Sequence, residues 1–312
     1  MNAPEPTRGG YLAVCLNPVI QKTLVYPRLV PGEVNRTAEH RVDVAGKGIC
    51  VTRVLGQLGR RVVHLTQLGG PTRDWFLDMC EADGLELSWV ESGSEIRFCT
   101  TLIDQGSGEA TELVEEARPV QPGTAERVLA QFSALLPACA TVMLSGTVAA
   151  GFPADIMPRM AALAAAAGKR LFLDLKGRAL LDSLSARPTL VKPNLEELYQ
   201  TYEPGRSRPG VDADEASIRE LVSRAGREYR ERYGSWLVVT RGTEPTLFWD
   251  GQGLRSAPVQ AAKALNPIGS GDSFNVGVAT ALEDGATIAE AVAEGNRLGA
   301  LNAERLKPGS IA

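Results

Sequence analysis

Short apolar runs alternate with amphipathic helical patterns along most of the chain, and this alternation limits the fold more than any other feature of the sequence. Six runs are predicted to form buried strands: residues 11–16, 62–68, 141–144, 171–175, 189–191 and 236–239. Between them, apolar residues recur at helical spacing, as in 51–58, 128–136 and 156–163. This pattern predicts an α/β fold with a mostly parallel sheet, covered on both faces by right-handed crossovers. An all-α or an all-β fold does not fit it.

Two segments interrupt this rhythm. In residues 22–44 and 96–114, polar and apolar residues alternate, which is typical of half-exposed antiparallel strands. The second segment contains two glycines within residues 105–108, a predicted hairpin turn. We expect the two segments to form a small sheet over one end of the parallel core. The polar stretch at 204–214, with its glycines and prolines, is predicted to be a surface loop.

The composition limits the partners of the chain. Lys and Arg number 33 and Asp and Glu 37, which gives a formal charge of −4. With 7 Phe, 4 Trp and 6 Tyr, a basic, base-stacking nucleic-acid binder is not expected. The longest uncharged run, residues 128–154, is interrupted by Pro137 and Pro153, so no membrane-spanning helix is predicted. A length of 312 residues allows one large domain or two ordinary ones.

Cysteines and histidines are few. Five widely spaced Cys residues without a CxxC pair argue against a disulfide framework and a structural zinc site. They favour a reducing compartment, so we expect a cytoplasmic protein. His40 and His64 are the only histidines, which excludes a His-rich metal centre. His64 lies in an apolar strand and is predicted to be structural, whereas His40 is predicted to be a solvated strand position.

A glycine-rich turn precedes a helical pattern in the last quarter of the chain. Gly269, Ser270 and Gly271 allow the backbone to turn tightly where free N–H groups and the positive end of a helix dipole bind anions. Asp272 follows in the same turn, which we expect to keep it ionised. An ionised carboxylate beside a phosphate site suits a general base that takes the proton of an attacking hydroxyl. The alternative is an Asp that serves only the helix dipole.

A second glycine cluster, Gly46-Lys47-Gly48, also precedes a helical pattern but does not match a P-loop. Close backbone approach together with one cation suits a phosphorylated or polyhydroxy substrate. The alternative is a tight turn with a solvated lysine.

Two polar motifs follow predicted strands. Asn194 and Glu197 match a helix capping box, and this structural role and a direct ligand role both stay open. Ser145 follows another strand and can present its hydroxyl at the carboxyl end of the sheet, where α/β proteins bind ligands.

These motifs, in this order and along nearly the whole chain, resemble the ribokinase-like PfkB family of carbohydrate kinases, in its 1-phosphofructokinase and tagatose-6-phosphate kinase branch. The resemblance is carried by Leu16-Asn17-Pro18, Pro31-Gly32-Glu33-Val34-Asn35-Arg36, Gly46-Lys47-Gly48, Ser145-Gly146, Lys192-Pro193-Asn194 and Gly269-Ser270-Gly271-Asp272. It implies one kinase domain over residues 1–312, with a three-layer α/β/α core. It also implies a small β-sheet lid formed by about 18–44 and 94–116.

The resemblance implies transfer of the γ-phosphoryl group of ATP, with Mg²⁺, to a hydroxyl of a sugar phosphate. Asp272 is then the base, and the backbone of Gly269, Ser270 and Gly271 forms the anion hole. The nucleotide side comprises Lys192, Asn194, Thr240, Gly242 and Asn296. The acceptor side comprises Gln21, Gly46, Lys47, Cys50, Arg97, Ser145 and Arg36. No residue is assigned as a direct metal ligand. Because lids in this family often pair two chains, we expect a homodimer in which Arg36 reaches the partner's site.

Three departures from the family pattern lie on the acceptor side. Gln21 stands where the family usually has Asp, and Ala45 and Cys50 replace a Gly and an Asn. Each lost partner of a sugar hydroxyl costs about 1–3 kcal/mol. We therefore hypothesise that the acceptor is not ordinary fructose 1-phosphate. Two alternatives stay open: a catalytically silent sugar or nucleotide sensor on the same fold, and a kinase of another sugar-like alcohol.

Overall fold

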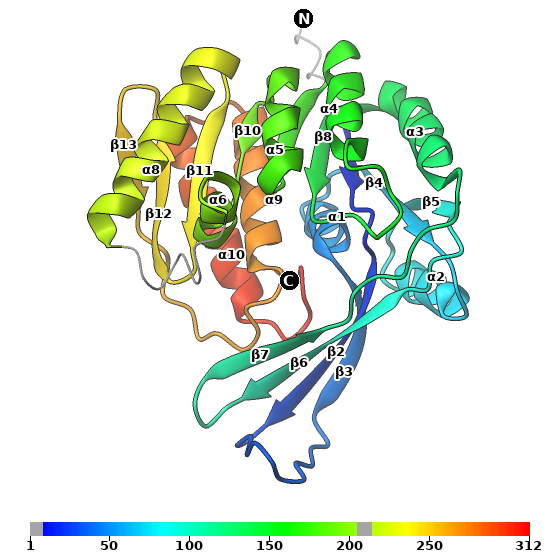
Figure 1. Ribbon diagram of the computed structural model, residues 1–312. Helices are drawn as coiled ribbons and strands as arrows, with labels where there is room; N and C mark the ends of the chain where they lie inside the picture. Colours follow the sequence, from blue (N-terminus) through cyan, green and yellow to red (C-terminus); the bar gives the residue numbers. More distant parts are fainter. Residues whose placement is uncertain (1–8, 205–213) are drawn as a thin grey trace, which may run out of the picture.

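The computed structural model describes residues 9–204 and 214–312, and in these residues nine strands form a large sheet and four form a small one (Figure 1). The order in the large sheet is β13-β12-β11-β10-β9-β8-β1-β4-β5. Its strands are β1 (Gly10–Val14), β4 (Val62–Leu68), β5 (Leu87–Glu91), β8 (Cys139–Ser145), β9 (Arg170–Asp174), β10 (Leu190–Val191), β11 (Trp236–Arg241), β12 (Glu244–Trp249) and β13 (Leu254–Ala257). From β11 to β5 the pairing is parallel, as the apolar runs predict.

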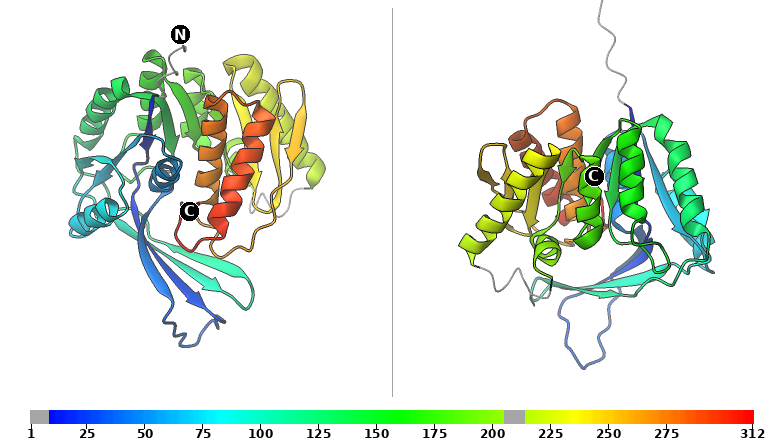
Figure 2. Two further views of the ribbon diagram at one scale, coloured as in Figure 1. Left: turned by 180° about the vertical axis from the view of Figure 1, so that it is seen from behind. Right: turned by 45° about the horizontal axis from the view of Figure 1, so that its top comes forward.

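Helices cover both faces of the large sheet (Figure 2). One face packs against α3 (Thr124–Leu135), α4 (Ile156–Ala166), α5 (Gly177–Ser183), α6 (Leu195–Tyr202) and α8 (Glu215–Glu228). The other packs against α1 (Lys47–Gln57), α9 (Ser270–Glu283) and α10 (Ile288–Ala303). A further helix, α2 (Arg73–Ala82), packs where the large sheet meets the small one. The predicted three-layer α/β/α architecture is confirmed.

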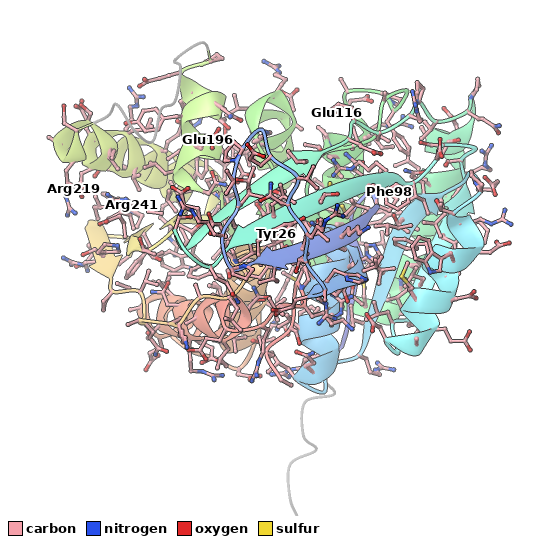
Figure 3. The ribbon with its side chains drawn as sticks, turned by 90° about the horizontal axis from the view of Figure 1, so that it is seen from below. Tyr26, Phe98, Glu116, Glu196, Arg219 and Arg241 are labelled. Atoms are coloured by element: carbon pink, nitrogen blue, oxygen red, sulfur yellow. The ribbon has the colours of Figure 1, made fainter. Side chains whose placement is uncertain are left out.

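The small sheet lies beyond the carboxyl ends of the parallel strands (Figure 1). It has the order β3-β2-β6-β7, from β2 (Val19–Tyr26), β3 (His40–Ala45), β6 (Arg97–Asp104) and β7 (Glu109–Val114). The predicted hairpin turn is present, because Asp104 pairs with Glu109 across residues 105–108. Both interrupting segments therefore form a second sheet, as predicted. The expected antiparallel pairing holds within each segment, but β2 and β6, which join the two segments, pair in parallel. Seen from below, this sheet extends across that end of the molecule (Figure 3).

Other sequence predictions have clear outcomes. His64 is buried in β4 with its ring Nδ1 3.2 Å from the Ala13 carbonyl oxygen, and burial lowers its pKa to about 4, so its structural role is confirmed. His40 is exposed at the start of β3. No helix within residues 9–204 and 214–312 has the length and apolar character needed to cross a bilayer. The loop predicted at 204–214 lies, apart from its two end residues, outside the described residues.

The antiparallel strands β12 and β13 were not predicted from the sequence. They extend the sheet beyond β11, with Val238 opposite Phe248 and Phe248 opposite Arg255. Each is short, and β13 has a half-exposed, partly charged pattern. Such an edge strand carries little of the apolar signal that identifies the central strands.

Candidate active site

A cavity of about 140 Å³ opens where the carboxyl ends of β1, β8 and β9 face the start of α1 and the small sheet. Its lining consists of Cys15, Asn17, Gly46, Lys47, Arg97, Gly146, Thr147, Asp174, Lys176 and Glu197. Parallel strands and right-handed crossovers bring these segments together, because every strand of such a sheet ends at the same edge. The sequence places Gly46, Lys47 and Arg97 on the acceptor side, and they do lie together in this cavity.

The glycine-rich turn forms the start of α9. Gly269 has a φ of 85°, and a Cβ built there would lie 2.4 Å from the Gly309 backbone nitrogen, so glycine is required for two reasons. The Ser270 N–H is used inside the turn, where it donates to the Pro267 carbonyl at 3.1 Å. The next N–H groups of the first helical turn, from Gly271 and Asp272, have no acceptor within the helix. The anion-binding capacity of the turn therefore rests on these N–H groups rather than on that of Ser270.

Asp272 is only 7% exposed, and burial raises its pKa to about 7. The charge of Lys47 opposes this shift, Asp174 adds to it, and Lys192 and the Cys50 thiol oppose it. A pKa near 7 leaves this carboxyl only partly ionised at neutral pH, so the expectation that the turn keeps Asp272 ionised is wrong. The dipole of a helix contributes about 0.3–2 kcal/mol, which is less than the desolvation of a buried carboxylate. A base with a pKa near neutrality is well matched to proton transfer at pH 7.

Next to Asp272 lies a compact cluster of charges. Lys47 Nζ is 2.9 Å from Asp174 Oδ1 and 2.9 Å from Glu197 Oε1. Lys192 Nζ is 3.6 Å from Asp174 Oδ2, an ion pair rather than a hydrogen bond. Two lysines and two carboxylates balance, so an ionised Asp272 gives the cluster a net negative charge. Lys47 and Lys192 nevertheless lower the pKa of Asp272 and only Asp174 raises it, so the neutral form is favoured by burial.

The pKa values of Lys47 and Asp174 are themselves shifted by this cluster. Burial alone would raise the pKa of Asp174, but Lys192 and Lys47 outweigh it and hold that pKa below its usual value. Burial alone would lower the pKa of Lys47, but Asp174 and Glu197 raise it. Both groups therefore stay charged near neutral pH. Asp174 was not singled out in the sequence, although an acid directly after a buried strand is a signal that could have found it.

Asn194 and Glu197 form the predicted capping box. Asn194 Oδ1 accepts from the Glu197 N–H at 2.8 Å, and Glu197 Oε2 accepts from the Asn194 N–H at 2.9 Å. Glu197 uses its other oxygen for Lys47. The start of α6 is thereby joined to the start of α1, a link that the local motif does not reveal.

The other residues that were predicted on the acceptor side lie outside the cavity lining. Gln21 is buried, and its amide donates to the Thr101 hydroxyl at 2.6 Å within the small sheet. The Cys50 thiol is hydrogen-bonded to Asp272, and burial raises its pKa well above the usual value. Ser145 is buried and its hydroxyl donates to the Val14 carbonyl at 3.4 Å. These side chains do not line the cavity. Arg36 is exposed on the loop between β2 and β3.

The predicted nucleotide-side residues lie along neighbouring strand ends. Lys192 Nζ is 3.8 Å from the position of a Cβ at Gly271, so it stands beside the glycine-rich turn. Thr240 pairs with Asn194 in a parallel bridge, and Gly242 follows in the turn after β11. The Asn296 amide is used inside the protein, where its Oδ1 accepts from Thr246 and its Nδ2 donates to the Pro258 carbonyl.

Asn17, Thr147 and Lys176 are among the cavity residues that the sequence analysis did not assign to the site. Asn17 donates from Nδ2 to the Thr147 hydroxyl at 3.0 Å, and its buried Oδ1 has no partner among the described residues. Lys176 donates to the neutral Gln200 amide at 3.0 Å. All three follow strands β1, β8 and β9 directly, so the carboxyl-end rule could have identified them.

Comparisons with known proteins agree with this arrangement. A family model described as pfkB family carbohydrate kinase matches residues 14–311. Phosphofructokinase-2 from Escherichia coli, in a structure with fructose-6-phosphate, aligns with a TM-score of 0.80 and 20% identity, over 97% of this chain and 96% of that chain. Its tetrameric inhibited form gives 0.79 and 20%, over 95% and 94%. A Thermotoga maritima protein described as a possible 1-phosphofructokinase gives 0.82 and 19%, over 95% and 92%. At these identities the alignments establish the fold.

Proposed function

Because the chain belongs to the pfkB family of carbohydrate kinases, we propose that it transfers the γ-phosphoryl group of ATP to a hydroxyl of a sugar phosphate, with Asp272 as the general base. The observation that carries this proposal is the position of Asp272. It stands in the first turn of α9, where the N–H groups of Gly271 and Asp272 have no acceptor within the helix. It is also coupled electrostatically to Lys47 and Lys192. This combination offers a base and an anion site in one place.

In the proposed step the acceptor oxygen forms a bond to the γ-phosphorus while the bond from that phosphorus to the bridging oxygen breaks and ADP leaves. Asp272 takes the proton of the acceptor hydroxyl. The free N–H groups at the start of α9 and the Lys192 ammonium stabilise the negative charge on the transferred group. This chemistry depends on positioning and charge more than on covalent help.

Mg²⁺ is the expected companion of ATP, and the residues present fit it. Asp174 Oδ2 is buried and has no hydrogen-bond partner among the described residues, and a carboxylate oxygen is the ligand that Mg²⁺ prefers. Asp174 would hold the ion through this oxygen, and the ion would neutralise charge on the phosphates.

The acceptor we propose carries an anionic group. Lys47 is already neutralised by Asp174 and Glu197, which leaves Arg97 and Lys176 as the cavity cations without a carboxylate partner among the described residues. The buried Nε of Arg97 also has no hydrogen-bond partner among the described residues. A phosphate dianion matches two such cations.

Ordinary fructose 1-phosphate remains disfavoured as this acceptor. Gln21 and Cys50, two of the three residues that depart from the family pattern, use their polar groups on Thr101 and Asp272. The Gln21 Nε2 and the Cys50 thiol are therefore already engaged inside the protein.

The test is an ADP-release screen with ATP and Mg²⁺ over phosphorylated, sulfonated and neutral sugars. We expect turnover with a phosphorylated member, lowered by about 10²- to 10⁴-fold in Asp272→Asn. Asp182→Asn, a surface change on α5, is the matched control and should keep full turnover. Unchanged turnover in Asp272→Asn would remove Asp272 as the base. No turnover with any acceptor would favour the silent sensor, and a preference for neutral sugars would refute the anionic acceptor.

We also propose that two copies pair through the small sheet. Leu113 on its outer strand β7 is 55% exposed, and Val34 on the loop before β3 is 78% exposed. Figure 3 shows this face of the sheet, with Phe98 and Tyr26 on it. Burying these side chains against a second copy would remove an exposed apolar patch at an unpaired sheet edge. Sedimentation should give a dimer for the native chain and a monomer for Leu113→Asp; a native monomer would refute the pairing.

The proposal places the enzyme in the cytoplasm. Its five cysteines are free and buried, as expected for a protein that folds in a reducing compartment.

A further inference from the structure

Asn302, on α10, makes three hydrogen bonds, two to the glycine-rich turn and one to the C-terminal segment. Its Nδ2 donates to the Ile268 carbonyl at 2.9 Å and lies 3.0 Å from the Ser270 hydroxyl. Its Oδ1 accepts from the Ser310 N–H at 3.1 Å. The side chain is fully buried and lies outside the cavity lining.

These bonds bracket the one residue of the turn whose backbone is in the left-handed region. Ile268 precedes Gly269 and Ser270 follows it, so a single amide group fixes the chain on both sides of the positive φ. Glycine has no side chain to restrict its own backbone. The direction of the free N–H groups after Gly269 therefore depends on contacts from elsewhere in the fold.

The third bond of Asn302 ties the turn to the C-terminal segment. Gly309, next to Ser310, packs so closely on the turn that its nitrogen lies only 2.4 Å from the position a Cβ would take at Gly269. A Cβ at Gly309 would in turn lie 2.5 Å from Cys50 Cα, and the Cys50 thiol is bonded to Asp272. Asn302 thus stands at the junction of the turn, the C-terminal segment and the helix that supports the base.

We propose that Asn302 is a positioning residue for phosphoryl transfer. It fixes the turn so that the first N–H groups of α9 point at the transferred group, and it touches neither nucleotide nor acceptor. The inference rests on the proposed function. A purely structural amide would affect stability alone, whereas a positioning amide affects the recognition of the γ-phosphoryl group and leaves the recognition of ADP unchanged.

The test uses Mg²⁺–ADP with and without beryllium fluoride, which occupies the γ-phosphoryl position and needs no acceptor. Calorimetric titration gives the fluoride gain, which is the ratio of the Kd for Mg²⁺–ADP without beryllium fluoride to the Kd with it. In Asn302→Asp, the carboxylate still accepts from Ser310 N–H but cannot donate to the Ile268 carbonyl. We expect its Kd for Mg²⁺–ADP to stay within about twofold of the native value, and the fluoride gain to fall about tenfold.

The matched control is Gln57→Leu. Gln57 holds the same C-terminal segment, with Nε2 3.2 Å from the Ser310 hydroxyl and Oε1 2.8 Å from the Ile311 nitrogen, but it does not touch the turn. We expect the full fluoride gain in this variant. An equal loss in Gln57→Leu and Asn302→Asp would assign the effect to the docking of the C-terminal segment and overturn the role of Asn302.

A full fluoride gain in folded Asn302→Asp would also overturn the proposal. If that variant does not fold, Ser270→Ala removes one of the two contacts to the turn and should lose the gain several-fold; an undiminished gain there refutes the inference. A native protein without any fluoride gain would instead refute the proposed function, and this inference with it.

Discussion

Replacing Asp272 by Asn should lower turnover by about 10²- to 10⁴-fold and stabilise the fold at the same time. The buried carboxyl has a pKa of about 7 in the folded chain, against an ordinary value of 3.8 for an Asp side chain. Between these two pH values the native state binds the proton more strongly than the unfolded state does. The free energy of unfolding therefore falls as the pH rises from about 4 to about 7. A neutral Asn resembles the protonated acid, so the free energy of unfolding of Asp272→Asn should not fall over this pH range.

The magnitude follows from the same shift. A difference of about three pKa units corresponds to about 4 kcal/mol at 1.36 kcal/mol per unit. The excess stability of Asp272→Asn should thus be small at pH 4 and reach about 4 kcal/mol above pH 7. Lys47 and Lys192 oppose this shift, and the burial of the carboxyl outweighs them.

The assay is urea unfolding of both proteins at several pH values from 4.5 to 8.5, with Asp182→Asn as the surface control. The control should follow the native chain at every pH. If the difference between native and Asp272→Asn does not grow with pH, or if the variant is less stable at pH 8, the burial argument for Asp272 is wrong.

Three further predictions concern the same site. The kcat/KM of the enzyme should fall as the pH drops below about 7, because Asp272 acts as a base only when it is deprotonated. Lys47→Met should move this fall to a pH about one unit higher, because Lys47 lowers the pKa of Asp272. An unchanged pH profile would show that Lys47 is not an electrostatic partner of Asp272. Lys176→Met should raise KM for a phosphorylated acceptor about tenfold or more and leave KM for ATP unchanged; equal changes in both would contradict an acceptor role. Gly269→Ala should lower the free energy of unfolding by more than the roughly 1–3 kcal/mol of left-handed strain alone, because its Cβ meets the Gly309 nitrogen. Gly285→Ala, with a φ of 89° and open space around it, is the control, and equal losses in denaturant unfolding would refute the crowding argument.

The sequence predicted those parts of the site that depend on neighbouring residues. The capping box of Asn194 and Glu197 is a local motif, and it forms as predicted. The glycine-rich turn begins a helix, because the positive φ at Gly269 and the apolar periodicity after it both depend on residues that are consecutive in the sequence. The small sheet follows from its alternating pattern in the same way.

The expectations that failed depend on burial. Asp272 was expected to stay ionised from its position in a helix turn, yet its pKa depends on how deeply the surrounding chain buries it. The Asn296 amide and the Gln21 amide find partners inside the protein, on β12, the segment before α9 and β6. A sequence read position by position does not show which polar groups use up their hydrogen bonds internally.

The order of strands, helices and glycine turns was determined by the sequence alone, because periodicity and backbone freedom are properties of short segments. Only the tertiary structure decided that Lys47 meets Asp174 and Glu197, which are 127 and 150 residues away in the chain. The same holds for Asn302, whose amide reaches the turn from another helix. Charge neutralisation and desolvation act through space, so the partner of each buried group is set by which segments the fold brings to one edge of the sheet.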